Sequence, residues 1–154
     1  IYTFEPEKSN FEALKKNIEH NSFKGIHIFN MAIAEKGGFI NLNVSEKSTG
    51  SHSVLEAHIN DTSVQKVKTT TLENVVNENN IKHIDLIKLD IEGAEYDILF
   101  SIPDRIINII DRIVLEIHKH PKYSQEELVS FLEEKGFSVD ISPTSNRVYR
   151  VFRK

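Results

Sequence analysis

The chain has 154 residues, enough for one compact domain, and its 39% hydrophobic and 27% charged residues argue against a disordered or fibrous protein. A formal charge of −4 gives no reason to expect nucleic acid as a partner, and the lack of cysteine excludes disulfides and thiolate metal sites. No apolar run approaches the roughly 20 residues of a membrane-spanning helix, and no signal-peptide pattern opens the chain, so we expect a cytoplasmic protein without a membrane partner.

The first quarter of the chain predicts a strand, a helix and a second strand. Residues 1–4 already read as a buried strand, so we expect upstream sequence to be missing. Ser9 and Glu12 have the spacing of a capping box, which predicts that the following helix begins at Ser9. Residues 26–29 then predict the next strand, so strand and helix patterns alternate as they do around a parallel sheet.

The middle of the chain predicts more strands around a long polar segment. Alternation over residues 39–44 is typical of a half-buried antiparallel strand. Residues 45–63 form a polar excursion of the length that often belongs to binding sites. Val67–Thr71 is a β-branched strand, and Ile84–Ile91 is so apolar that we expect a central strand covered on both faces.

The last third predicts another strand, a helix and a closing hairpin. Residues 112–118 form the strand, and Ser124 with Glu127 has the spacing of a second capping box. Residues 137–142 and 147–152 predict an antiparallel hairpin at the edge of the sheet. Together the elements indicate an α/β fold that is doubly wound, with a mostly parallel Rossmann-like sheet and an antiparallel C-terminal edge hairpin.

Acidic residues follow several of these strands, where ligands bind in open α/β sheets. Glu5 follows the first strand, and its carboxylate can either accept hydrogen bonds from a ribose diol or cap the next helix. Asp90, Glu92 and Glu95 fall within six residues at a later turn. Helix-dipole complementation can explain the two glutamates but explains Asp90 poorly, so we expect a functional role for Asp90.

Glu116 and His118 are two residues apart, so in a strand they point to the same face. Such a carboxylate can orient the imidazole as a general base, although a surface pair is the alternative. His120 ranks lower because Pro121 ends the strand. The other histidines show no ligand spacing and are assigned to surface or core: 20, 27, 52, 58 and 83.

The same residues offer oxygen and imidazole ligands for a divalent cation. Asp90, Glu92, Glu116 and His118 would suit Mg, Mn or Zn. Because the spacing does not fix a ligand count, we expect no metal.

Several short motifs occur in an order that resembles the FkbM family of S-adenosylmethionine-dependent methyltransferases. The resemblance covers residues 2–137, and its most specific part is the Lys-x-Asp-x-Glu-Gly-x-Glu run at 88–95. The other motifs that carry it are Phe4-Glu5-Pro6, residues 16–21, Asn30-Met31-Ala32, Thr70-Thr71-Leu72 and Leu115-Glu116-Ile117-His118.

This resemblance implies a class I methyltransferase that uses S-adenosylmethionine to methylate a hydroxyl of a small molecule or sugar. It implies that Glu5 holds the ribose and that Met31 and Ala32 lie against the adenine. It also places Asp90 near the methionine moiety and the substrate, with Glu92 and the 116–118 pair nearby. His118 is the candidate base for the acceptor hydroxyl, and Asp90 is the second.

The chain departs from this family pattern at its start. The glycine-rich turn that holds the methionine end of the cofactor would precede Glu5 and is absent. We therefore expect a single methyltransferase domain over residues 1–154 that lacks its first strand and glycine-rich turn and binds cofactor poorly alone. The alternatives are a methyltransferase-like binding domain without catalysis and, less favoured, a divalent-metal-dependent hydrolase.

Overall fold

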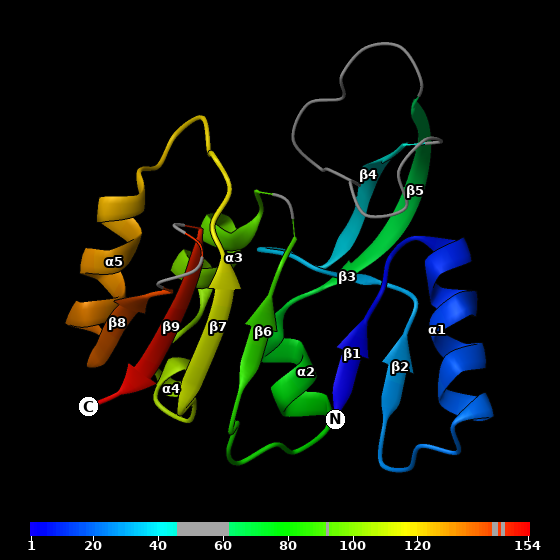
Figure 1. The fold of residues 1–154 in the computed structure, drawn as a ribbon, viewed down its shortest axis with the longest axis horizontal. Helices are drawn as coiled ribbons and strands as arrows, with labels where there is room; N and C mark the ends of the chain where they lie inside the picture. Colours follow the sequence, from blue (N-terminus) through cyan, green and yellow to red (C-terminus); the bar gives the residue numbers. More distant parts are fainter. Residues whose placement is uncertain (46–61, 92, 143–144, 146) are drawn as a thin grey trace. The chain divides into compact units, whose positions relative to one another are not determined.

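A computed structural model describes residues 1–45, 62–91, 93–142, 145 and 147–154 (Figure 1). The chain divides into two compact units, Ile1–Thr71 and Leu72–Lys154, which are treated separately below. Within the described ranges, no helix combines the length and the apolarity that crossing a membrane would require.

The described residues of the first unit form one helix and five strands. They are β1 (Tyr2–Phe4), α1 (Lys8–His20), β2 (His27–Phe29), β3 (Ala32–Ile33), β4 (Gly38–Ser45) and β5 (Thr62–Thr70). β1 pairs in parallel with β2, and α1 connects them, so the predicted strand–helix–strand order is confirmed. Stacked rings join the two strands, with Phe4 and Phe29 centroids 5.0 Å apart.

The start of α1 differs from the prediction. Glu7, not Ser9, is the N-cap, and its carboxylate accepts a hydrogen bond from the backbone N–H of Asn10 at 2.7 Å. Ser9 lies inside the helix and donates its hydroxyl hydrogen bond to Glu7. The capping-box prediction was wrong because the helix begins two positions earlier than a Ser9 cap requires, and the Glu7 carboxylate accepts from the free amide of Asn10.

β4 and β5 form the predicted antiparallel pair, and β3 adds to β5 in parallel. Among the described residues of β4 and β5, the hydrophobic side chains of Leu42 and Val67 are buried, whereas those of Phe39 and Val64 are largely exposed. β5 begins at Thr62, earlier than predicted. Residues 46–61, most of the predicted polar excursion, lie outside the described part of the chain.

In the second unit, the part of the chain that the structure describes forms four helices and four strands. They are α2 (Leu72–Glu78), β6 (Ile87–Leu89), α3 (Glu95–Ser101), α4 (Asp104–Ile107), β7 (Arg112–Glu116), α5 (Gln125–Glu134), β8 (Phe137–Ile141) and β9 (Val148–Arg153). The strand order is β6-β7-β9-β8, with β6 and β7 parallel and the β8–β9 hairpin antiparallel as predicted. The capping box of Ser124 and Glu127 is also confirmed.

The α/β class is confirmed, but the sheets are mixed and not mostly parallel. β9 runs antiparallel to β7 as well as to β8, and β4 runs antiparallel to β5. The predicted central strand at Ile84–Ile91 is shorter, and among the described residues it is hydrogen-bonded only to β7. Within the described sheet of this unit β6 is therefore the edge strand, and its Lys88 is exposed.

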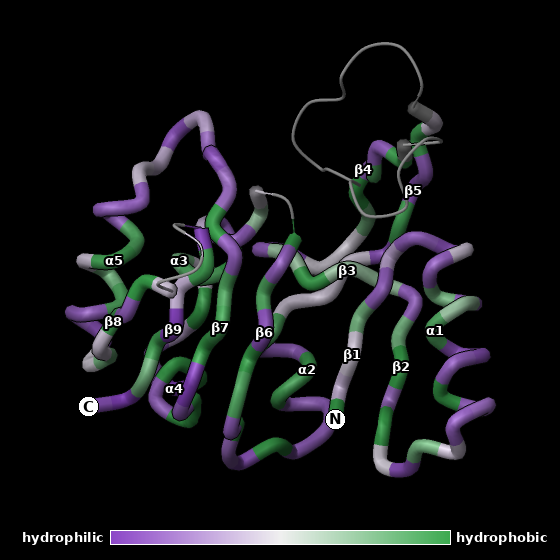
Figure 2. Tube along the Cα trace, viewed as in Figure 1, coloured by the Kyte–Doolittle hydropathy of each residue, from purple (hydrophilic) through white to green (hydrophobic). Residues whose placement is uncertain are grey.

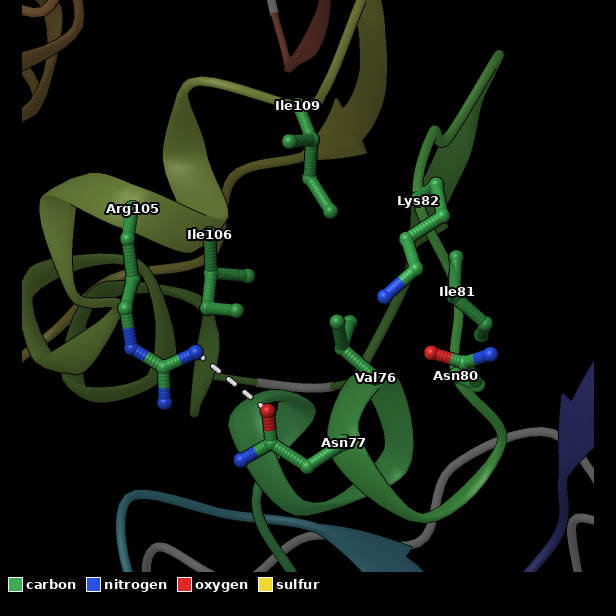
Figure 3. Close-up of a pocket in the computed structure, with 8 residues that line it drawn as sticks. All are labelled: Val76, Asn77, Asn80, Ile81, Lys82, Arg105, Ile106 and Ile109. Atoms are coloured by element: carbon green, nitrogen blue, oxygen red, sulfur yellow. Dashed lines mark hydrogen bonds between the residues drawn. The ribbon is translucent and has the colours of Figure 1, made fainter.

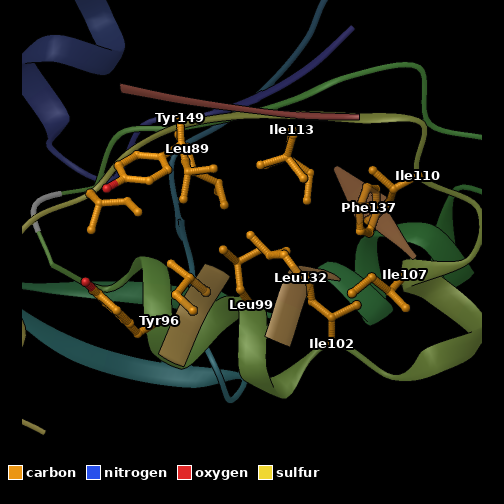
Figure 4. Close-up of a cluster of buried hydrophobic side chains, with 14 of the residues drawn as sticks. Leu89, Tyr96, Leu99, Ile102, Ile107, Ile110, Ile113, Leu132, Phe137 and Tyr149 are labelled. Atoms are coloured by element: carbon orange, nitrogen blue, oxygen red, sulfur yellow. The ribbon is translucent and has the colours of Figure 1, made fainter. Parts of the chain in front are cut away.

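One hydrophobic core holds the second unit together (Figure 4). Alternate residues of β7 and its extension, Ile113, Leu115 and Ile117, are at most 2% exposed. They belong to one cluster with Leu99 of α3 and Leu132 of α5. Helix α1 of the first unit differs from the helices of this core. Hydrophilic positions recur along it (Figure 2), and none of its residues is buried.

Arg153, the last residue of β9, ties several elements of this unit together. Its guanidinium donates to the carbonyls of Ile110 at 3.1 Å and Lys135 at 2.8 Å, and also to the carbonyl of Ile107. It lies 4.0 Å from the ring centroid of Phe137. The carbonyls of Ile107 and Lys135 lie at the C-terminal ends of α4 and α5, so the Arg153 cation also complements both helix dipoles.

Candidate active site

Glu5 lies where the sequence predicts it, at the carboxyl end of β1. Its backbone N–H extends the pairing of β1 with β2 by donating to Phe29 O at 3.0 Å. Its side chain is half-buried, and Oε1 accepts from the backbone N–H of Glu7 at 2.9 Å. The carboxylate is therefore held at the strand end by its own turn, in a position from which it can also accept from a diol.

Asn30 joins the ends of β1 and β2, a role that was not predicted from the sequence. Its Nδ2 donates to Glu5 O at 2.9 Å and to Pro6 O at 3.1 Å. Met31 and Ala32 follow directly and are half-buried. Glu5 and the Met31-Ala32 pair thus lie at the carboxyl ends of neighbouring parallel strands, as expected for parts of one binding surface.

Glu7 is the buried carboxylate of this unit, at 3% exposure. Burial alone would raise its pKa, but hydrogen bonds donated by Ser9, Asn10 and Gln65 outweigh burial and lower the pKa from 4.5 to about 2. The Gln65 amide lies on β5, 3.2 Å from Glu7 Oε1. Glu7 therefore fixes the turn that carries Glu5, and its partners give it a structural role.

The second unit brings three predicted site residues together. Asp90 follows β6, Glu116 ends β7 and His118 comes two residues later. One oxygen of each carboxylate and one ring nitrogen of His118 lie within 4.8 Å of one another. We call these residues the Asp90–Glu116–His118 group. Glu92, the fourth predicted catalytic residue, lies outside the described residues.

Glu95 holds His118 by a contact that the sequence did not predict. Glu95 Oε1 lies 2.8 Å from His118 Nδ1, and the Glu95 side chain is completely buried. Its carboxylate also accepts from the backbone N–H of Ile91 at 3.2 Å and of Gly93 at 2.9 Å. A carboxylate accepts only, so His118 donates from Nδ1, and in the neutral imidazole the lone pair then lies on Nε2.

Sequence reasoning assigned Glu95 to the helix dipole and missed this contact. The spacing held a signal, because Glu95, Leu99 and Ile102 recur on the one face of α3 that is buried. An acidic residue on an apolar helix face needs a buried partner. The turn before it depends on Gly93, whose φ of 107° is a conformation that other residues rarely adopt.

His120, which the sequence ranked below His118, has a structural place in an aromatic cluster. Its ring packs against Tyr96 and Tyr123, with centroids 5.2 Å and 4.9 Å away. Its Nδ1 accepts from the backbone N–H groups of Lys122 and Tyr123, both at 3.2 Å. Burial, followed by the nearby Glu95 carboxylate, raises the pKa of Tyr96 to about 12.

His83, assigned to surface or core, is exposed but belongs to a second group at the opposite ends of β6 and β7. Its Nε2 lies 3.1 Å from Asp111 and 3.6 Å from Asp85. All three side chains are more than half exposed, so this group has the properties of a surface ion pair.

A pocket of about 250 Å³ also lies away from the strand carboxyl ends (Figure 3). Val76, Ile106 and Ile109 give it apolar walls. Arg105 at its rim donates to Asn77 at 3.2 Å and pairs with Glu73, so its charge is already matched within the protein.

The sequence matches the model of the methyltransferase FkbM domain over residues 1–139. It is 25% identical over 177 aligned residues to Methyltransferase 1 of Beauveria bassiana, an alignment that covers all of this chain and 71% of that protein. It is 32% identical over 74 residues to the AMB antimetabolite synthetase AmbE of Pseudomonas aeruginosa, which covers 46% of this chain and 4% of the synthetase. No solved structure matches significantly. With the family model spanning nearly the whole sequence, the chain belongs to the FkbM methyltransferase family.

Proposed function

We propose that this protein is a class I, Rossmann-like methyltransferase that uses S-adenosylmethionine to methylate a hydroxyl of a small molecule or sugar. The observation that carries the proposal is the Asp90–Glu116–His118 group, set at the carboxyl ends of two neighbouring parallel strands. In open α/β sheets this is where ligands bind. Family membership supplies the class of reaction.

The cofactor half of the proposal rests on the ends of β1 and β2. We assign the ribose hydroxyls to the Glu5 carboxylate, which its bond from the Glu7 N–H holds in place. We assign the adenine to Met31 and Ala32 and the methionine end to the neighbourhood of Asp90. An acceptor-only carboxylate beside half-buried apolar residues fits a nucleoside, whose diol donates and whose base is flat and apolar.

The acceptor half rests on the Asp90–Glu116–His118 group. The cofactor supplies a methyl group on a sulfonium, so the protein mainly has to align donor and acceptor and exclude water. A hydroxyl is a weak nucleophile and needs a group that takes up its proton or weakens its O–H bond. We place this task at the Asp90–Glu116–His118 group and assign Glu92, two positions after Asp90 in the sequence, to the catalytic residues.

The ribose assignment is tested by Glu5→Ala. We expect its affinity for S-adenosylmethionine to fall about tenfold or more, because a charged acceptor loses bonds of roughly 1.5–3 kcal/mol. Isothermal titration calorimetry measures the affinity, with Glu12→Ala on the exposed face of α1 as the matched control. Equal affinities for Glu5→Ala and wild type would remove Glu5 from the site.

The acceptor assignment is tested by His118→Ala. We expect turnover to fall by about two orders of magnitude or more with little change in cofactor affinity, as is usual when a group acts on the reacting proton. Transfer of radiolabelled methyl groups to a panel of glycosides and alcohols measures turnover. His83→Ala, at the other end of the strands, should leave it unchanged, and wild-type turnover in His118→Ala would contradict the assignment.

A further inference from the structure

We propose that the Asp90–Glu116–His118 group is a binding site for a divalent cation of the Mn²⁺ or Zn²⁺ kind. Binding itself does not depend on the proposed function. What the cation does for an acceptor hydroxyl does rest on that function.

The first support is the spacing of the donor atoms. Two carboxylate oxygens and one imidazole nitrogen, delivered by the ends of β6 and β7, lie within 4.8 Å of one another. Oxygen ligands of divalent cations lie about 2.0–2.6 Å from the ion, so donors around one ion are separated by at most about 4–5 Å. The three donors can therefore share one ion with small side-chain movements.

The second support is how His118 is held. Histidines that bind metals nearly always donate their other ring N–H to a carboxylate or carbonyl, which fixes the tautomer and the ring orientation. Glu95 does this from a fully buried position, 2.8 Å from Nδ1. Two backbone N–H groups, of Ile91 and Gly93, hold Glu95 in turn. The imidazole is thus prepared to present the lone pair of Nε2.

The third support is the charge and openness of the group. Asp90 and Glu116 bring two carboxylates close together, and the cation nearest to Asp90 is Lys88, 3.1 Å from Oδ2. The side chains of Lys88 and Asp90 are 68% and 42% exposed, so this ion pair is weak and easily exchanged. Because Asp90 is exposed, water can reach its carboxylate.

The second group of the same residue types, His83 with Asp85 and Asp111, shows what the first one adds. There a single imidazole nitrogen faces both carboxylates directly, at 3.1 and 3.6 Å, and all three side chains are exposed. That group is held by exposed side chains in the described part of the chain, whereas the fully buried Glu95 holds His118. The second group therefore serves as a control that is matched in composition and lacks the buried support.

A bound cation would change the role that the sequence suggests for His118. The imidazole would act as a ligand and not as a direct base, and an acceptor hydroxyl on the ion would lose its proton more readily. Methyl transfer would then require the cation and fall when a chelator removes it.

The test uses the whole protein without an affinity tag and Mn²⁺ alone, with no methyl donor. Electron paramagnetic resonance measures free Mn²⁺ during titration, and circular dichroism checks that each variant is folded. We expect one site in the wild type, and at least tenfold weaker binding in Asp90→Asn, Glu116→Gln and His118→Ala. His83→Ala should bind like the wild type. Glu95→Gln should bind roughly 10–100-fold more weakly while it keeps all three ligands.

Wild-type Mn²⁺ affinity in folded His118→Ala, or loss of the site in His83→Ala, would overturn the proposal. Absence of a site in the wild type would overturn it as well. Chelator-insensitive methyl transfer without Mn²⁺ binding would refute the cation site and leave the methyltransferase intact. The opposite outcome is Mn²⁺ binding that needs His118 in a protein that neither binds the methyl donor nor transfers methyl groups. It would support the cation site and refute the methyltransferase function.

Discussion

The two units hold their site residues by different means. The second unit places the Asp90–Glu116–His118 group on strands whose other face is packed into a large hydrophobic core. In the first unit, Leu42 and Val67 are the buried hydrophobics among the described residues. Glu5 there is fixed by backbone pairing, by stacked rings and by the amide of Asn30. A site on a packed core is preorganised by apolar burial, whereas a site such as that of Glu5 depends on each polar contact.

Each unit also buries one carboxylate at the start of a helix, and the partners separate the two. Glu7 is bonded to groups of its own turn and to Gln65, which gives it a structural role. Glu95 is bonded to two backbone amides and to the imidazole of His118. Burial of an acid therefore does not by itself identify a functional residue. The side chain that it bonds to makes the difference: Gln65 for Glu7 and His118 for Glu95.

The largest expected effect lies in the core of the second unit. Leu99 is 0% exposed, so Leu99→Ala should lower the free energy of unfolding by about 3–4 kcal/mol through lost burial and a cavity. Val64→Ala, at a 61% exposed position of the first unit, should change it by less than about 0.5 kcal/mol. Urea denaturation measures the free energy of unfolding of both variants. A similar decrease in the two would contradict the difference that we draw between the units.

The next effect concerns Glu7 and acid. A carboxyl whose folded pKa is depressed stabilises the protein above its ordinary value of 4.5, and this contribution is lost as the pH falls toward about 2. We expect Glu7→Gln to lose at most about 3 kcal/mol at neutral pH. Its difference from the wild type should shrink below about pH 4.5.

Urea denaturation of Glu7→Gln and wild type across this pH range provides the check. Glu12→Gln, on an exposed position of the same helix, is the control and should show a small difference at every pH. A Glu7→Gln difference that is constant from neutral pH to about pH 2.5 would show that the Glu7 contribution is not electrostatic.

The smallest effect is at Asn30. Asn30→Ala removes two exposed hydrogen bonds to the carbonyls of Glu5 and Pro6, which should cost about 1 kcal/mol or less. If polar contacts position Glu5, calorimetry should also show weaker binding of S-adenosylmethionine. Asn41→Ala, exposed on β4, is the matched control. Unchanged affinity in Asn30→Ala would show that backbone pairing alone holds Glu5.

Local patterns predicted most of the fold. The capping box at Ser124 and the hairpin that follows α5 depend on neighbours in sequence, and both are confirmed. The sequence also selected Asp90, Glu116 and His118, which the structure brings together. Family motifs identified the family.

The predictions that failed depend on partners distant in sequence or on competition between neighbours. Glu95 meets His118 across 23 positions, so only the buried face of α3 hinted at it. Glu7 is the cap in place of Ser9 because the helix begins at Lys8, which leaves the amide of Asn10 to the Glu7 carboxylate, and Glu7 also accepts from Gln65 of β5. β6 was predicted to be central from its apolar residues, but hydrophobicity does not specify how many strands pair with it.

The placement of Arg153 bears on where the domain can be cut. The family match stops at residue 139, within β8, whereas β9 extends to Arg153. Shortening the protein to the matched segment would strip β7 of its antiparallel neighbour and leave the carbonyls of Ile107, Ile110 and Lys135 without their shared cation. Glu116 at the tip of β7 would lose its register with Val148. An expression boundary chosen from the family match alone would thus damage the strand that carries Glu116 of the Asp90–Glu116–His118 group.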